Sequence, residues 1–117
     1  MKKRELRQLL LTVLLTTVGF SANGDQISGR ELLAFCQSES ATEQKGYCRG
    51  YISAAIETHA AWALWDRLEP VFCFPEGDKF EHAYGAVIAY LQANKIQQDY
   101  EASSLVLNSL NQAFPCE

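Results

Sequence analysis

Four cysteines constrain this chain more than any other feature of its sequence. They are Cys36, Cys48, Cys73 and Cys116, and all of them follow residue 24 of the 117-residue sequence. An even number of cysteines in an exported domain of fewer than about 100 residues predicts disulfides, because so small a domain has a thin core. Zinc is the competing interpretation, but no two of these cysteines have C-x₂-C spacing. We therefore expect two disulfides and no metal site.

The first 24 residues predict export. A basic head of four Lys and Arg residues is followed by residues 9–20, which contain no charge. This length is typical of a signal peptide and too short for a membrane span, which needs roughly 20 apolar residues. Cleavage is expected after Ser21 or Gly24, and an uncleaved amphipathic anchor is the alternative. We thus divide the chain into a signal peptide, residues 1–24, and one domain, residues 25–117.

The domain of residues 25–117 is acidic. It contains six Lys and Arg residues against thirteen Asp and Glu residues, which gives a net charge of −7. This charge repels nucleic acid and anionic lipid, and it favours a partner with a basic surface. We expect neither nucleic-acid binding nor a stable membrane anchor after processing.

Apolar residues repeat at three- and four-residue steps through the domain, which is typical of helices that bury one face. Ser28 and Glu31 have the spacing of a capping box at the start of a first helix. The second helix is expected from about Gly46 to Leu68, the third from about Asp78 to Asn94, and the fourth from near Asp99 to Phe114. No strand pattern competes. The sequence predicts an all-α fold, a single four-helix domain with up-down, bundle-like topology.

This topology chooses among the three pairings that four cysteines allow. Cys36 ends the first helix and Cys48 begins the second, so both lie at one end of the bundle. Cys73 follows the second helix and Cys116 follows the fourth, so both lie at the other end. Bridged Cα atoms lie within about 7 Å, whereas the two ends are roughly 20 Å apart at about 1.5 Å per helical residue. We predict Cys36–Cys48 and Cys73–Cys116.

Little in the sequence could carry catalysis. Glu57 with His59 and Glu81 with His82 are the nearest pairs, but side chains at these spacings diverge on a helix. His59 shares the apolar face of the second helix with Trp62, where a hydrogen-bonded core histidine is commoner than a catalytic base. His82 is expected to face solvent. No serine-hydrolase, metalloprotease or phosphate-binding motif is present. We predict a protein that is not an enzyme and holds no cofactor.

Five residues are candidates for contact with a protein partner: Trp65, Phe74, Glu76, Asp78 and Tyr90. Trp65 and Tyr90 fit the apolar stripes of their helices poorly, and exposed aromatic residues anchor many interfaces. The other three lie in the loop after the second helix, which Cys73 would tie down. This loop is either a solvated turn or a rigid acidic projection that meets the basic rim of a partner's cleft.

Several short motifs follow one another through the domain. They are LLAFC at residues 32–36, CRGYI at 48–52, CFP at 73–75, ASSLV at 102–106 and AFPC at 113–116. In this order and spacing they resemble the Rap/Tai family of type VI secretion amidase-immunity proteins, over roughly residues 29–116. The chain departs from the family pattern at Ala54, where a glycine is common, and Glu57 stands in for a nearby acidic residue.

The resemblance implies a periplasmic helical protein, often a homodimer, that binds and inhibits a toxic peptidoglycan amidase delivered by neighbouring or sister cells. Two other functions compete with this expectation. One is a periplasmic acid-stress chaperone, although two disulfides would oppose a large opening of the fold. The other is a small hydrolase or metal-binding enzyme that depends on His59 or His82.

Overall fold

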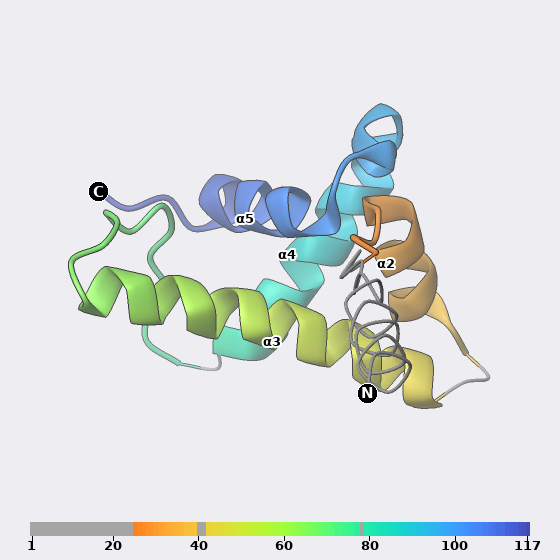
Figure 1. Ribbon diagram of the computed structural model, residues 1–117, viewed down its shortest axis with the longest axis horizontal. Coiled ribbons are helices and arrows are strands. Elements are labelled where there is room, and N and C mark those ends of the chain that lie inside the picture. Colours follow the sequence, from red (N-terminus) through yellow and green to blue (C-terminus); the bar gives the residue numbers. More distant parts are fainter. Residues whose placement is uncertain (1–24, 40–41, 78) are drawn as a thin grey trace, which may run out of the picture.

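The structure is a computed structural model that describes residues 25–39, 42–77 and 79–117. In this part of the chain the helices are α2 (Gly29–Gln37), α3 (Thr42–Leu64), α4 (Lys79–Ala93), the 3₁₀-helix η1 (Lys95–Asp99) and α5 (Ala102–Ala113) (Figure 1). The described residues contain no strand beyond one isolated bridge pair. The predicted all-α fold is confirmed.

Two sequence predictions concern parts of the chain outside the described residues. The first is the signal peptide of residues 1–24 with its cleavage site, and the second is the start of the third helix at about Asp78, since Asp78 itself is not described. Among the helices that the structure describes, none has the length and hydropathy to cross a membrane.

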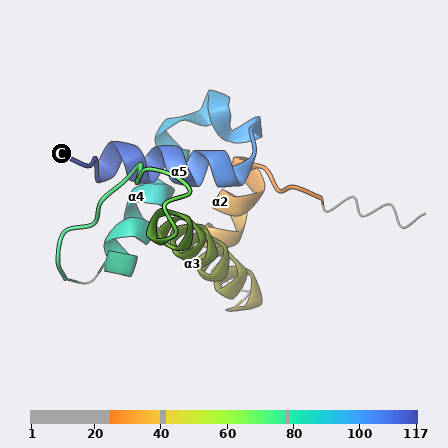
Figure 2. The same cartoon turned by 60° about the vertical axis from the view of Figure 1, so that its left-hand side comes forward.

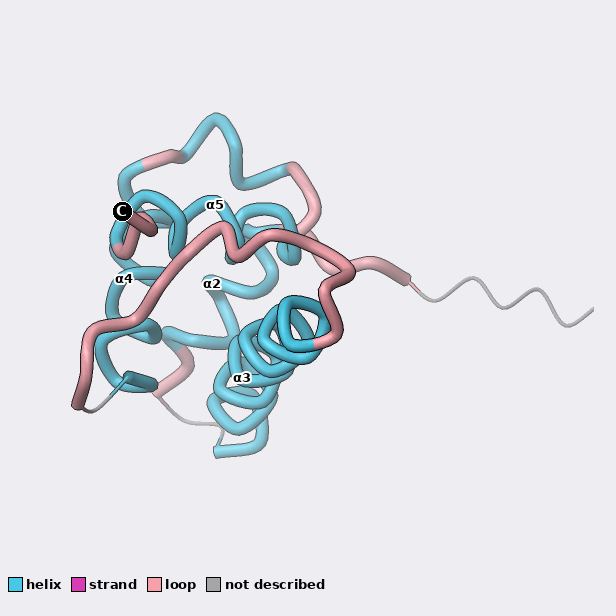
Figure 3. The backbone as a smooth tube through the Cα atoms, turned by 90° about the vertical axis from the view of Figure 1, so that its left-hand side faces the viewer, coloured by secondary structure: helices cyan, strands magenta, loops and turns pink. Residues whose placement is uncertain are grey.

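The four α-helices are not all aligned with one another. In Figure 1, α3 and α5 run in the same direction, α4 rises obliquely toward the start of α5, and α2 descends at a steep angle to α3. α2 packs chiefly against α3, while α4 packs chiefly against α5. The segment after α3 leaves the end of that helix, passes over α5 and then turns to the start of α4 (Figures 2 and 3).

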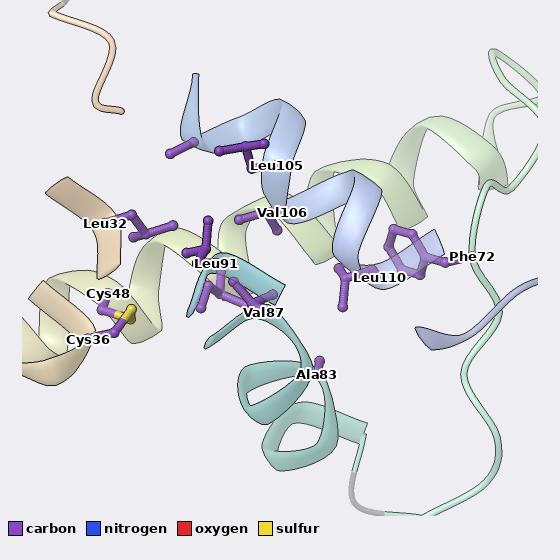
Figure 4. Close-up of a cluster of buried hydrophobic side chains, with 12 residues drawn as sticks. Leu32, Cys36, Cys48, Phe72, Ala83, Val87, Leu91, Leu105, Val106 and Leu110 are labelled. Carbon is purple, nitrogen blue, oxygen red and sulfur yellow. A yellow bond between two sulfur atoms is a disulfide. The ribbon is translucent and has the colours of Figure 1, made fainter. Parts of the chain in front are cut away.

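The core lies where the four α-helices meet (Figure 4). α4 contributes Ala83, Val87 and Leu91, which are spaced at four-residue steps and are at most 1% exposed. This confirms the apolar stripe predicted for that helix. The other buried apolar side chains are Leu32, Cys36, Cys48, Ile52, Phe72, Ala102, Leu105, Val106 and Leu110. Full burial of one leucine or isoleucine contributes about 1.5–3 kcal/mol.

Both predicted disulfides are present. Cys36–Cys48 joins the end of α2 to the first turns of α3, with 5.2 Å between the Cα atoms. Cys73–Cys116 joins the segment after α3 to the residues that follow α5, with 4.9 Å between the Cα atoms. The two links lie at opposite ends of α3, as the up-down topology requires.

The predicted capping box begins α2. The Ser28 hydroxyl oxygen accepts the Glu31 backbone N–H at 3.2 Å, and the Glu31 carboxylate accepts the Ser28 backbone N–H at 2.8 Å. These two bonds satisfy N–H groups that a helix start leaves without partners. The bonds from Ser28 to the Glu31 carboxylate also lower the pKa of Glu31, because they stabilise its charged form.

The predicted bounds of the second helix were wrong at both ends. α3 begins at Thr42, because residues 42–45 include Glu, Gln and Lys, which are good helix formers. It ends at Leu64, where Asp66 adopts a positive φ of 51°. The Arg67 N–H then donates to the Trp62 carbonyl at 2.9 Å, and the Asp66 N–H donates to Ala63. This is a Schellman ending, formed here without glycine.

The predicted start of the last helix was also wrong. α5 begins at Ala102, because the backbone of Tyr100 and Glu101 is not helical and pairs with the chain ahead of α2. The Gly29 N–H donates to the Tyr100 carbonyl, and the Ala102 N–H donates to the Ile27 carbonyl, each at 2.9 Å. A contact between distant parts of the chain thus sets the boundary of α5.

Gly29 lies where α2 meets α5. A Cβ at this position would lie 2.3 Å from Leu105 Cδ1 and 3.1 Å from Leu91 Cδ2. Both leucines are buried, so neither can move aside freely. Only glycine fits this contact without a shift of the core.

We expect Gly29→Ala to lower the free energy of unfolding by about 1–3 kcal/mol, because it overpacks the core. Gly50→Ala is the matched control. Gly50 lies within α3, and a Cβ added there would have nothing within 4 Å, so alanine should raise stability by about 0.5–1 kcal/mol. Urea unfolding of both variants measures this difference, and equal midpoints would contradict it.

Candidate partner-binding surface

An apolar groove lies between α3 and α5. Its walls include Tyr51, Ala54 and Trp62 of α3, Leu68 of the segment after α3, and Leu107 of α5. The groove encloses about 380 Å³ and opens to solvent. An apolar hollow of this size is large enough to receive side chains from another molecule.

The groove carries no acidic or basic side chain apart from His59. α5 contributes to this property, since its sequence ASSLVLNSLNQA contains no charged residue. The second half of α3, from Ala54 to Leu64, contains Glu57 as its single carboxylate, and Glu57 lines a different hollow. The groove is therefore an uncharged face on an acidic domain.

Large aromatic side chains extend this face at the end of α3. Trp62 and Trp65 are 46% and 64% exposed, and their rings meet edge to face with centroids 6.1 Å apart. Tyr47, near the other end of α3, is 48% exposed. The expectation that Trp62 lies on the buried apolar face of its helix was thus wrong. α3 is longer than the helices packed against it, so aromatic residues toward its ends extend past the core.

His59 holds the segment after α3 against that helix. Its Nε2 accepts the Val71 backbone N–H at 3.0 Å, and its ring stacks on Phe72 with centroids 4.1 Å apart. The side chain is buried, and burial lowers the pKa of His59. Because Nε2 accepts a hydrogen bond, the imidazole is neutral in this arrangement. The geometry confirms a hydrogen-bonded core histidine.

Further contacts hold the same segment on α5. The Asn111 side-chain amide donates to the Val71 carbonyl, and the Cys73 N–H donates to the Phe114 carbonyl at 2.8 Å. The Phe74 ring meets the Phe114 ring with centroids 5.0 Å apart. Phe72 is buried and Phe74 is half-buried, whereas Val71 is 43% exposed.

The carboxylates next to the two histidines have other partners. The Ser53 hydroxyl donates to Glu57 at 3.2 Å. Glu81 pairs with Arg49, which lowers the pKa of Glu81, while His82 is exposed. Within the described ranges, no three His, Cys, Asp or Glu side chains are placed to share a metal ion.

Comparison with known families identifies the chain. Residues 28–116 match the family model of the Rap1a immunity proteins. The chain belongs to this family. The match confirms the resemblance to the Rap/Tai family, and it covers every helix described above. No curated protein and no solved structure matches the chain. As a Rap1a-family immunity protein, it has a secreted effector as its expected partner.

The candidate contact residues of this Rap1a-family protein do not form one surface. Trp65 lies beside the groove through its contact with Trp62, and Glu76 is exposed. Phe74 is half-buried among aromatic rings, and Asp78 lies outside the described residues. Tyr90 lies in a separate hollow of α4, where its hydroxyl donates to Gln97 at 2.8 Å. Their role in binding stays a prediction.

Sequence reasoning missed the groove itself. Helical spacing places Tyr51 and Trp62 on the apolar face of their helix, but periodicity does not tell which part of such a face a neighbouring helix covers. One signal was available, because α5 and the second half of α3 carry almost no charge in a chain rich in carboxylates.

We expect His59→Phe to cost about 1 kcal/mol of stability at pH 7.5, since phenylalanine keeps the ring contact and loses the hydrogen-bond acceptor. The difference in stability between the wild type and the variant should be smaller at pH 5.5. The pKa of His59 in the folded protein lies below its ordinary value of 6.5, so the unfolded wild type binds more protons as the pH falls below that value, and folding loses free energy. The variant has no titrating group at position 59, so its stability does not fall for this reason.

Urea unfolding of both proteins at the two pH values measures this effect. Carboxylates titrate alike in the two proteins, so their contribution cancels in the difference. A gap that is the same at pH 7.5 and pH 5.5 would show that His59 does not link stability to pH.

Proposed function

We propose that this protein is exported to the periplasm, where it binds and inhibits a peptidoglycan amidase delivered by type VI secretion and so protects the producing cell. The observation that carries the proposal is the family match over residues 28–116. This range takes in nearly all of the domain that follows the predicted signal peptide.

The two disulfides support the proposed compartment. Disulfides form and persist in oxidising compartments such as the periplasm, and they are rare in the cytosol. All four cysteines of the chain are paired within the domain. Peptidoglycan lies on the same side of the inner membrane, so an inhibitor of an amidase that cuts it must act there.

The charge of the domain supports a protein partner with a basic surface. A net charge of −7 over residues 25–117 speeds encounter with such a surface. Glu69 and Glu76 are exposed on the segment that His59 and Cys73 hold in place. A segment attached in this way loses little conformational freedom on binding, which favours affinity.

The proposal includes a homodimer formed through the groove. Two copies of an acidic domain repel each other wherever their carboxylates face each other. The groove between α3 and α5 is a face where this repulsion is small, and Trp62, Trp65 and Leu68 supply apolar surface there. A second copy is therefore the occupant that the charge pattern favours. The carboxylates outside the groove stay available to a basic effector.

A mixed culture on solid medium tests immunity. A derivative that lacks this gene should be lysed by the parent strain on contact, under conditions where the secretion system is active. Returning the full chain should restore survival. Returning residues 25–117 without the first 24 should not, because the protein then stays in the cytoplasm. Equal survival of the parent and the derivative would contradict the proposal.

The dimer is tested on protein purified from the periplasm after export of the full chain. Sedimentation velocity should show a dimer that Ala54→Glu dissociates, because this change places facing carboxylates in the groove. Ala60→Glu is the matched control, since Ala60 is another exposed alanine of α3 but does not line the groove. A wild-type monomer at about 100 μM, or equal effects of the two changes, would remove the groove from this role.

A further inference from the structure

The two disulfides differ in their surroundings. Cys36 and Cys48 are 6% and 0% exposed, and they form part of the core cluster with Leu32 and Ile52. Cys73 and Cys116 are both exposed, and neither lies in a helix. A thiol can therefore approach the second disulfide in the folded protein, whereas core side chains cover the first.

The exposed disulfide also has a different mechanical role. It links the segment after α3 to the residues after α5, and both cysteines lie outside the helices. Residues 65–67 are held to the end of α3 by backbone hydrogen bonds. The attachments of the residues after them include the bonds of Val71 to His59 and Asn111, the bond from Cys73 to Phe114, and aromatic packing. Leu68 of the same segment forms one wall of the groove.

We propose that Cys73–Cys116 is a redox-sensitive latch, which a dithiol reductant opens while Cys36–Cys48 and the four-helix core stay intact. Opening would loosen residues 68–77 and the end of the chain, and with Leu68 it would loosen the wall of the groove. This inference concerns regulation of the fold and does not require that the protein act in immunity.

The chemistry is a thiol–disulfide exchange. A thiolate of the reductant attacks one sulfur of Cys73–Cys116, forms a mixed disulfide with it and releases the other cysteine as a thiolate. The second thiol of the reductant then attacks the mixed disulfide and releases the second cysteine. Two electrons pass to the protein, and the reductant becomes a disulfide. In the cell, a thioredoxin-like dithiol protein is the class of partner that supplies these electrons.

The test uses dithiothreitol as the reductant on the exported, oxidised protein under native conditions. Samples are taken over time, trapped with iodoacetamide and mapped as peptides. Cys73 and Cys116 should be alkylated first, while the Cys36–Cys48 peptide remains linked and the helical circular dichroism is retained. Joint reduction of both disulfides, earlier reduction of Cys36–Cys48, or resistance of both would overturn the proposal.

A second measurement tests the release of the segment. Trypsin should cut after Arg67 faster in the selectively reduced protein than in the oxidised protein, because opening the latch loosens the residues that directly follow Arg67. The double variant C73S/C116S should be cut as fast as the selectively reduced protein, without any reductant. C36S/C48S is the matched control. Loss of the Cys36–Cys48 disulfide in this variant should lower the helix content. Unchanged cleavage after Arg67 on selective reduction would show that Cys73–Cys116 is not a latch.

Discussion

The fold depends on covalent links at both ends of a thin core. The apolar side chains buried in the described residues form one cluster of twelve, and two of these are the half-cystines of one link. In the loop-entropy account, closing the 12-residue loop of Cys36–Cys48 contributes about 3 kcal/mol, and the 43-residue loop of Cys73–Cys116 contributes about 4 kcal/mol. Domains of this kind have a net stability of about 5–15 kcal/mol. Together the two links are therefore comparable to the whole margin.

The length of α3 has a second consequence, which concerns function. α3 spans Thr42–Leu64, whereas α5 spans Ala102–Ala113, so α5 cannot cover the whole apolar face of α3. The uncovered part becomes the groove and the exposed tryptophans beside it. The carboxylates lie on other surfaces of the domain and leave this face neutral. The domain thus presents two chemically distinct surfaces, one suited to an apolar contact and the other to a basic partner.

Local sequence signals were sufficient where local contacts decide the structure. Ser28 and Glu31 form their capping box within four residues, and the stripe of α4 follows from helical spacing. The disulfide pairing followed from which helix end each cysteine occupies. Signals failed where distant residues decide, since the start of α5 depends on pairing with the chain ahead of α2. The end of α3 was missed for a local reason, because Asp66 adopts a positive φ that is usually taken by glycine. Burial of Trp62 could not be predicted, because it depends on how far α5 extends.

His59 invites a catalytic interpretation, but its contacts give it a structural role. Its one hydrogen bond and its stack on Phe72 fix the segment after α3, and Asn111 and the Cys73–Cys116 link fix the same segment from the side of α5. A loop with this many attachments has already lost its conformational entropy in the free protein. An inhibitor gains affinity from such preorganisation, because the cost of ordering does not fall on the binding step. The same attachments make the segment sensitive to whatever removes one of them. Protonation of His59 would remove the hydrogen bond to Val71, and reduction of Cys73–Cys116 would remove the covalent link, so each would loosen the segment from a different side.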